Sequence, residues 1–440
     1  MKYYMLPPEL FAYNRERFAK KMAADSLAIF HSNDLMPRSG DTYFPFRQNS
    51  GLFYLCGIDQ PDTVLVLFPG CVKDTYEEVL FIKRTDEFTA RWQGATLTRE
   101  MAAHLSGIRR VHWIDEMGSI MHELVLLAKR VYVNLGEHDR FFTEVPSRDM
   151  RALKQLQERY PAHKYHRAAP LLKKLMMIKS AWEVDLIRQA VDITGAAFRK
   201  VLAMVEPGVQ EYEVEAEITA EFLRQRATGH AYEPIVASGP HTCTLHYTRN
   251  NRKCQNGDLL LLDIGAEYAN YASDITRTIP VSGQFSPRQR QVYESVLSIF
   301  YFARSGMTPG ITLEELQKEV GRFAEKKLVE LGLLHPSDLQ RQNPEAPLYK
   351  QFFLHGVSHH LGLDVHDPAN RYDPLLAGMV LTCEPGIYLP AENIGIRLEN
   401  DILITDEGPV DLAARIPIEA EEIEDIMQLR AEGWAGLIMP

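Results

Sequence analysis

The sequence has few cysteines, no long apolar run and no excess of positive charge, and each absence excludes a class of protein. The cysteines are Cys56, Cys71, Cys243, Cys254 and Cys383. Their odd number and the lack of a Cys-x-x-Cys pair favour reduced core thiols over disulfides or a thiolate metal site. No apolar stretch approaches the ~18 uncharged residues of a membrane-spanning helix, and the N-terminal residues show no secretory signal pattern. We therefore expect a cytoplasmic protein without membrane contact.

The charge balance argues against a nucleic-acid partner. The formal net charge is -11, whereas nucleic-acid binding relies on the neutralisation of phosphates by lysine and arginine. An apolar fraction of 45% with 24% charged residues is typical of a globular protein. A chain of 440 residues is too long for one ordinary core, so we expect two domains. A peptide or small-molecule substrate fits this composition better than a nucleic acid.

The first part of the chain alternates strand-like and helix-like segments, which predicts an α/β domain. Strands are expected at 26–30, 63–68, 79–82 and 130–133, and helices at 12–22 and 150–160. A Pro-containing basic stretch at 161–174 follows. Ser180 and Glu183 then form a Ser-x-x-Glu capping box that should start a helix running to Met204. We place an N-terminal domain at residues 1–172 and a second domain at 173–440.

The second domain shows an internal duplication. Pro207-Gly208 and Pro309-Gly310 each lie between two helical patterns, and each helix pair is followed by strands. Two matching phrases then occur in the same order, at 257–265 and 378–386. Each consists of a glycine, an apolar run, one acid and a second glycine. Because self-similarity reveals architecture better than single-element assignments do, we expect an α+β domain with pseudo-two-fold symmetry.

Each half contributes two acids that end apolar segments. Asp263 and Asp274 lie on the two arms of one predicted hairpin, and Glu384 and Glu399 on the arms of the other. Four carboxylates in one place would repel each other and take up protons unless cations neutralise them. Oxygen ligands favour Mn²⁺, Mg²⁺ or Ca²⁺, and one added imidazole moves the preference toward Mn, Fe, Co or Zn. The histidine-rich segment 354–367 is the natural source of that imidazole.

Two further histidines recur at matching positions. His246 precedes the first glycine-acid phrase by about the same interval as His366 precedes the second. A lone histidine is more often a satisfied core residue than a functional one. The pairing of these histidines ahead of paired acids favours a functional role, whereas His360 has no such counterpart.

The order of these motifs closely resembles the pita-bread metallopeptidases of family M24, in the Xaa-Pro aminopeptidase (aminopeptidase P) branch. The motifs are Leu262-Asp263-Ile264-Gly265, Ser273-Asp274-Ile275-Thr276-Arg277-Thr278, His355-Gly356-Val357-Ser358-His359, Val365-His366-Asp367, Glu384-Pro385-Gly386-Ile387-Tyr388 and Gly395-Ile396-Arg397-Leu398-Glu399. The phrase Tyr43-Phe44-Pro45-Phe46-Arg47-Gln48-Asn49-Ser50 extends the likeness to the branch's N-terminal domain, a ribonuclease-H-like α/β fold without nuclease activity.

The resemblance implies a site with two divalent metal ions, usually Mn²⁺ in the family, with Zn²⁺ or Co²⁺ as alternatives. Asp263 would chelate one metal, His359 and Glu384 would hold the other, and Asp274 and Glu399 would bridge both. A hydroxide between the metals would attack the Xaa-Pro bond, since coordination lowers the pKa of water from 15.7 to about 7. Glu384 would also accept and donate the proton.

The resemblance also implies residues that contact the substrate. His246 and His366 would stabilise the tetrahedral intermediate, and His355, Tyr388 and Arg397 would shape a pocket for proline. Proline needs a dedicated pocket because its nitrogen lacks a hydrogen and its ring fixes the backbone. The family precedent also favours a homodimer or homotetramer, in which a tryptophan at the position of Trp92 enters a neighbouring subunit's site. A core or surface tryptophan is the alternative.

Three other functions remain open at this point. A prolidase shares the fold and the five metal ligands but cleaves only Xaa-Pro dipeptides. A methionine aminopeptidase shares the ligands but usually lacks this N-terminal domain. A non-enzymatic pita-bread protein typically loses ligands, which this chain retains. Two departures from the family leave assembly and pocket rim open: Gly51 stands where an acid is common, and the segment between Tyr388 and Gly395 is short.

Overall fold

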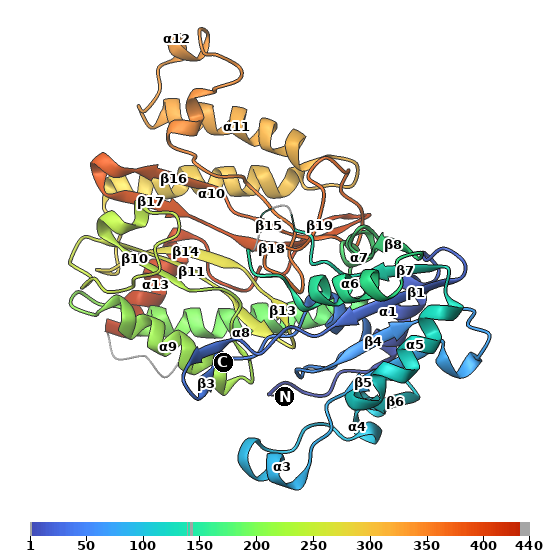
Figure 1. Ribbon diagram of the computed structural model, residues 1–440. Coiled ribbons are helices and arrows are strands. Elements are labelled where there is room, and N and C mark those ends of the chain that lie inside the picture. Colours follow the sequence, from blue (N-terminus) through green and yellow to red (C-terminus); the bar gives the residue numbers. More distant parts are fainter. Residues whose placement is uncertain (1, 139, 141–143, 432–440) are drawn as a thin grey trace. The chain divides into compact units, whose positions relative to one another are not determined.

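The computed structural model describes residues 2–138, 140 and 144–431. The chain divides into two compact units, Tyr3–Met176 and Met177–Pro440, which Figure 1 colours from blue to green and from green to red. In the described part of the chain, no helix combines the length and the apolar composition needed to cross a membrane.

A six-stranded mixed sheet forms the centre of the first unit, in the order β6-β5-β4-β1-β7-β8. Its strands are β1 (Ser26–His31), β4 (Val64–Leu67), β5 (Glu78–Ile82), β6 (Arg110–Trp113), β7 (Arg130–Val133) and β8 (Lys164–Arg167). The pairs β1–β4 and β4–β5 are antiparallel, and β5–β6, β1–β7 and β7–β8 are parallel. A separate ribbon pairs β2 (Pro37–Ser39) with β3 (Thr42–Tyr43).

Seven α-helices accompany this sheet in the described residues. They are α1 (Pro8–Ala19), α2 (Ser50–Cys56), α3 (Glu87–Gln93), α4 (Arg99–Ser106), α5 (Met117–Leu127), α6 (Arg148–Arg159) and α7 (Ala169–Met176), with 3-10 turns η1 (Asp74–Tyr76) and η2 (Ile114–Glu116). The predicted α/β fold class is therefore confirmed. Helix α1 begins earlier than its apolar pattern suggested, because Pro8 supplies a fixed φ at the first helical position.

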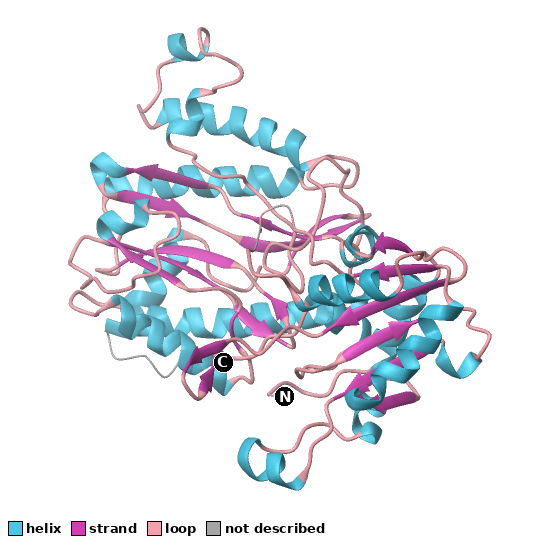
Figure 2. Cartoon of the chain, viewed as in Figure 1, coloured by secondary structure: helices cyan, strands magenta, loops and turns pink. Residues whose placement is uncertain are grey.

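Helices and small antiparallel sheets make up the second unit (Figure 2). The helices are α8 (Ala181–Met204), α9 (Glu211–Arg224), α10 (Pro287–Gly306), α11 (Leu313–Glu330), α12 (Pro336–Leu339) and α13 (Ala420–Ala431), with 3-10 turns η3 (Gly239–Cys243), η4 (Leu348–Gln351) and η5 (Pro390–Glu392). The strands are β9 (Gly229–His230), β10 (Ile235–Ser238), β11 (Leu259–Ile264), β12 (Ala266–Tyr268), β13 (Tyr271–Ala272), β14 (Ile275–Pro280), β15 (Val380–Cys383), β16 (Gly386–Leu389), β17 (Ile394–Arg397), β18 (Asn400–Thr405) and β19 (Gly408–Asp411).

The expected duplication is visible in the topology of this unit. Helices α8 and α9 precede the sheet β10-β11-β14, and α10 and α11 precede the sheet β15-β18-β19. In Figure 1 the strands β10, β11 and β14 lie between the α8–α9 pair and the α10–α11 pair. Each glycine-acid phrase supplies a buried strand, β11 or β15, that pairs with the next long strand, β14 or β18. This is the pita-bread α+β arrangement, so that prediction is also confirmed.

The capping box at the start of α8 forms as predicted. The Ser180 side chain accepts from the Glu183 backbone N–H, and the Glu183 carboxylate accepts from the Ser180 N–H. Two otherwise unpaired helix N–H groups are thereby satisfied. Helix α8 runs for 24 residues to Met204, where Pro207-Gly208 turns the chain toward α9.

Candidate metal centre

The first pair of acids lies at the ends of two neighbouring strands. Asp263 is the fifth residue of β11, between buried leucine and isoleucine neighbours, and Asp274 directly precedes β14. The two strands pair in antiparallel fashion, with Asp263 opposite Thr276 rather than directly opposite Asp274. The intervening residues form their own ribbon, β12–β13. Both carboxylates nevertheless reach one side chain, Tyr232.

The second pair of acids is held by the strands of the other half. Glu384 directly follows β15, and Glu399 lies between β17 and β18. Glu399 forms an isolated antiparallel bridge with Thr276 of β14, and the Thr276 hydroxyl donates to its Oε2 at 2.6 Å. This bridge brings the acids of the two halves into one buried cluster.

His359 enters this cluster with a fixed ring orientation. Its backbone N–H donates to the Thr382 hydroxyl at 3.1 Å, and its Nδ1 lies 3.1 Å from the His360 carbonyl oxygen. Because a carbonyl can only accept, Nδ1 carries the hydrogen and donates it. Nε2 is then directed at Asp274 Oδ2, at 3.4 Å, and at Glu384 Oε1, at 3.7 Å. A metal-binding histidine is commonly oriented in this way, by a hydrogen bond from its other nitrogen.

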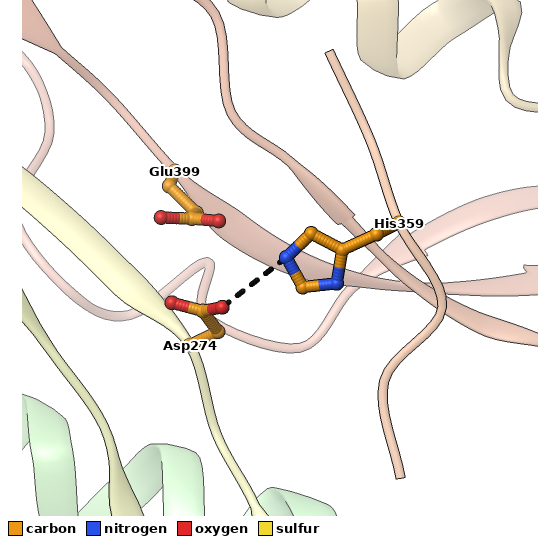
Figure 3. A group of neighbouring side chains, drawn as sticks. All are labelled: Asp274, His359 and Glu399. Carbon is orange, nitrogen blue, oxygen red and sulfur yellow. Dashed lines mark ion pairs between the residues drawn. The ribbon is translucent and has the colours of Figure 1, made fainter. Parts of the chain in front are cut away.

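Three of these side chains already have the spacing of a metal site. One ligand atom each of Asp274, His359 and Glu399 lies within 4.8 Å of the others, and all three residues are buried. Figure 3 shows the two carboxylates close together, with the imidazole nitrogen directed at Asp274. Glu384 adjoins the group through His359, and Asp263 adjoins it through Tyr232.

Tyr232 is a site residue that the sequence reasoning missed. Its hydroxyl oxygen lies 2.6 Å from Asp263 Oδ1 and 2.7 Å from Asp274 Oδ1. A phenol has one hydrogen and can donate it to only one acceptor at a time. The second short contact therefore requires a proton or a cation at one of the carboxylates. Burial and the neighbouring acids raise the pKa of Tyr232 well above its ordinary value, so the phenol stays protonated.

The negative charges of the four carboxylates exceed the positive charges of the protein groups around them. Burial, together with the charge of Asp263, raises the pKa of Asp274 to about 6. Burial and repulsion from Asp274, Glu384 and Asp263 raise the pKa of Glu399 well above its ordinary value. Carboxyls whose pKa is raised in this way are places where a bound cation would stabilise the ionised form.

The donor set fits divalent metal ions. It consists of four carboxylates and one imidazole, a combination suited to Mn²⁺, Zn²⁺ or Co²⁺. Two observations support the fit independently of any family pattern: the pair of short contacts to one phenol hydrogen, and the raised pKa values of Asp274 and Glu399. Cations bound to the acids would allow both carboxylates to contact the Tyr232 hydroxyl without an added proton. The same cations would lower the pKa values of Asp274 and Glu399.

Arg397, Tyr388 and His355 form a chain of contacts from Asp263 to Glu384. Arg397 forms an ion pair with Asp263 and donates to the Tyr388 hydroxyl at 2.8 Å. That hydroxyl lies 2.8 Å from His355 Nε2, and His355 Nδ1 lies 3.4 Å from Glu384 Oε2. The three residues predicted to line a proline pocket are therefore in contact with one another and with two predicted metal ligands.

The two histidines at matching positions differ in their surroundings. The His366 ring stacks on the His359 ring, with centroids 4.0 Å apart. His246 lies in the exposed loop after η3, and within the described residues it has no hydrogen bond or ion pair to the acid cluster. In the first unit, Trp92 of α3 is 76% exposed, with its ring beside Phe88.

Comparison with known proteins supports the interpretation of this geometry. The model of metallopeptidase family M24 matches residues 185–406, and that of the aminopeptidase P N-terminal domain matches residues 11–132. An Xaa-Pro aminopeptidase of Escherichia coli K12 is 35% identical over 95% of this chain and 97% of its own length. Human Xaa-Pro aminopeptidase 3 is 31% identical over 91% of this chain and 81% of its own.

Solved structures give the same result. An E. coli aminopeptidase P aligns with a TM-score of 0.88 at 33% identity, over 97% of this chain and 99% of that one. Aminopeptidase PepP of Pseudomonas aeruginosa aligns with a TM-score of 0.88 at 32% identity over the same shares. With the N-terminal domain, the M24 domain and the acid cluster all present, the chain belongs to the aminopeptidase P branch of the metallopeptidase family M24.

Proposed function

We propose that this metal-dependent aminopeptidase releases the N-terminal residue from peptides with proline in second position. The single observation that carries the proposal is the buried cluster of Asp274, His359 and Glu399, with Asp263 and Glu384 beside it. The relatives named Xaa-Pro aminopeptidase align over nearly the whole chain, including the N-terminal domain. That coverage favours an aminopeptidase over a prolidase.

The proposed metal ligands are the five residues of the cluster. Asp263 would hold one divalent ion, His359 and Glu384 the second, and Asp274 and Glu399 both. Bound divalent ions would lower the pKa of water and polarise the scissile carbonyl. We propose Mn²⁺ as the resident metal, with Zn²⁺ or Co²⁺ as substitutes. A relative, E. coli aminopeptidase P, has been solved in a zinc-substituted form with product.

Glu384 is proposed to move the proton during cleavage. Burial would raise its pKa, but the hydrogen bond from His355 and the charges of His355 and His359 outweigh burial and lower the pKa to about 2. Its carboxylate is therefore ionised at neutral pH, which is the form that a proton acceptor must have. Donation of that proton to the proline nitrogen would then release the shortened peptide.

The remaining predicted residues are proposed to bind the peptide. His366 and His246 would approach the scissile carbonyl from two loops, and hydrogen bonds to its developing negative charge would stabilise the transition state. His355, Tyr388 and Arg397 already form one connected network. They would form one wall of the pocket for the proline ring and support the metal ligands Asp263 and Glu384.

The test combines metal analysis and kinetics in one preparation. Purified protein should contain two divalent ions per chain and hydrolyse Xaa-Pro-Xaa peptides faster than Xaa-Pro dipeptides or Met-Ala peptides. Chelation should abolish activity, and Mn²⁺ should restore it. Glu384→Gln should retain the fold and lose activity. Exclusive cleavage of Xaa-Pro dipeptides would identify a prolidase. A protein that contains no metal, and whose peptide hydrolysis is unchanged by Glu384→Gln, would be a non-enzymatic protein.

We also propose a cytoplasmic homodimer or homotetramer in which Trp92 contacts a neighbouring subunit. The support is the large exposed surface of this side chain, 76% of which is accessible, since an exposed tryptophan is frequently an interface residue. Analytical ultracentrifugation of the parent and of Trp92→Ala tests the assembly. If Trp92→Ala has the same assembly mass and the same peptidase kinetics as the parent, Trp92 does not belong to a subunit interface.

A further inference from the structure

A buried ion pair joins Lys179 to Asp367 of the loop 359–367, which also carries His359 and His366. The Lys179 ammonium group donates to Asp367 Oδ2 at 2.9 Å, and each side chain is only 1% exposed. A buried ion pair adds little net stability, because desolvation of the two charges offsets their attraction. Stability alone therefore does not account for this pair.

Lys179 is held in place through its backbone. Its N–H donates to the carbonyl of Gly378 at 2.8 Å, and Gly378 begins the second glycine-acid phrase. Ser180, the next residue, caps helix α8. The backbone of Lys179 is thus fixed at two places. It adjoins the N-cap of α8, and it is hydrogen-bonded to Gly378, which shortly precedes β15.

Asp367 organises the loop from the inside. Its backbone N–H donates to the His360 carbonyl at 2.9 Å, which closes the loop, and its Oδ1 accepts from the Asp364 N–H at 3.3 Å. A Cβ at Gly362 would lie 2.7 Å from Oδ2, so the carboxylate fills the space beside this glycine. Lys179 then binds the same carboxylate from outside the loop.

His366 lies between the two fixed parts of this loop. It directly precedes Asp367, and its ring stacks on that of His359 with an interplanar angle of 27°. His359 itself is fixed by Thr382 and the His360 carbonyl. We therefore expect the Lys179–Asp367 ion pair to hold the backbone of His366 in place. The stacking contact with His359 holds its ring.

We propose that the Lys179–Asp367 ion pair positions His366 against the substrate, so that Lys179 and Asp367 are positioning residues of the peptidase. This inference rests on the proposed function, in which His366 contacts the scissile bond. The alternative is that Lys179 only neutralises Asp367 and serves the fold. The two ideas differ in one respect: a positioning residue acts through His366 and should lose its effect when that imidazole is absent.

A double-mutant cycle on the metal-loaded, full-length protein tests this coupling. Lys179→Met should lower kcat on an Xaa-Pro-Xaa peptide about 10- to 100-fold, with little change in KM or metal content. In a His366→Ala background, Lys179→Met should cause no further loss. Additive losses, or an unchanged kcat in Lys179→Met, would overturn the proposal. An unchanged kcat in His366→Ala itself would instead contradict the proposed function.

Lys200→Met is the matched control. Lys200 lies on α8, about 30 Å from the N-cap residue Ser180 at 1.5 Å per residue, and its ammonium group pairs with Glu221 at 3.1 Å. Its replacement should leave kcat unchanged. If Lys179→Met does not fold, the double variant K179M/D367N, which removes both charges, takes its place in the cycle. Failure of both to fold would assign the pair to stability and overturn the proposal.

A spectroscopic measurement covers the case in which His366→Ala has no measurable activity. In zinc-loaded protein labelled with ¹³C at the histidine Cε1 atoms, the His366 signal is identified by its absence from His366→Ala. That signal should shift in Lys179→Met and stay in place in Lys200→Met. An unshifted His366 signal in Lys179→Met would overturn the proposal.

Discussion

Arg397 forms an ion pair with Asp263, and the two residues come from opposite halves of the duplicated unit. Arg397 ends β17 of the second half, and Asp263 belongs to β11 of the first. The guanidinium is buried beside the acid cluster. Its burial and the charges around it act on its pKa in opposite directions. Burial lowers the pKa of Arg397, but Tyr388, Asp263 and Glu399 outweigh it and raise that pKa well above its ordinary value.

Arg397→Met should destabilise the metal-free protein by about 3 kcal/mol, because it leaves Asp263 buried without its cation. Chemical denaturation in the presence of a chelator measures this loss. Arg288→Met serves as the control: Arg288 pairs with Glu392, and both side chains are about one-third exposed, at 33% and 34%. That variant should lose less than about 1 kcal/mol. Equal losses in the two variants would contradict the prediction.

Tyr232→Phe should weaken metal binding about 10- to 100-fold, because the phenol orients the carboxylates of Asp263 and Asp274. Competition with a chelator of known affinity measures the change. Tyr293→Phe is a suitable control, since the buried Tyr293 hydroxyl donates to the Ile418 carbonyl, which is not a site residue. Its metal affinity should match the parent's. An unaltered affinity in Tyr232→Phe would exclude the phenol from the metal site.

Gly265→Ala should lower stability by at least about 2 kcal/mol and reduce metal content. The added Cβ would lie 1.9 Å from the Ser273 carbonyl oxygen, so the strands that carry Asp263 and Asp274 would have to move apart. Gly229→Ala is the matched control, with no heavy atom within 4 Å of its Cβ. Thermal unfolding and metal analysis compare the two. A stable, fully metallated Gly265→Ala would show that the hairpin adapts without cost to the site.

Glu221 provides a pH-dependent prediction away from the site. Burial raises its pKa, but contacts from Gln225, Lys200 and Arg224 outweigh burial, so the net shift is downward from 4.5. A lowered folded-state pKa contributes stability that is complete above the unfolded value and is lost as the pH falls through the folded value. Glu221→Gln should therefore cost about 1 kcal/mol at neutral pH.

Urea denaturation of Glu221→Gln and the parent from neutral pH to about pH 3 provides the measurement. The stability difference between the two should shrink once the pH falls below 4.5, the ordinary value for the carboxyl. A difference that stays constant across this range would mean that the Glu221 carboxylate charge does not contribute to stability.

Much of the second unit follows from short-range sequence chemistry. The Ser180–Glu183 capping box forms as predicted, because it needs only residues three apart. The glycine-acid phrases become the buried strands β11 and β15, because their apolar runs satisfy the burial of both faces. Repetition of these local patterns was sufficient to predict two related halves and a shared site.

Features set by long-range packing could not be predicted in the same way. Tyr232 lies 31 residues before Asp263 in a loop without periodic pattern, so its contact with two acids arises only from the folded sheet. The register that places Asp263 opposite Thr276 depends on the added ribbon β12–β13, which alternation alone does not reveal. The Lys179–Asp367 pair joins residues 188 positions apart, beyond any local motif.

The bridge between Thr276 and Glu399 joins two segments that are synthesised at different times. These residues are 123 positions apart, and the first half emerges from the ribosome long before the second. Because both halves supply proposed ligands, no chain that stops before Glu399 holds the complete set. A nascent chain therefore cannot assemble the proposed metal centre until Glu399 has left the ribosome.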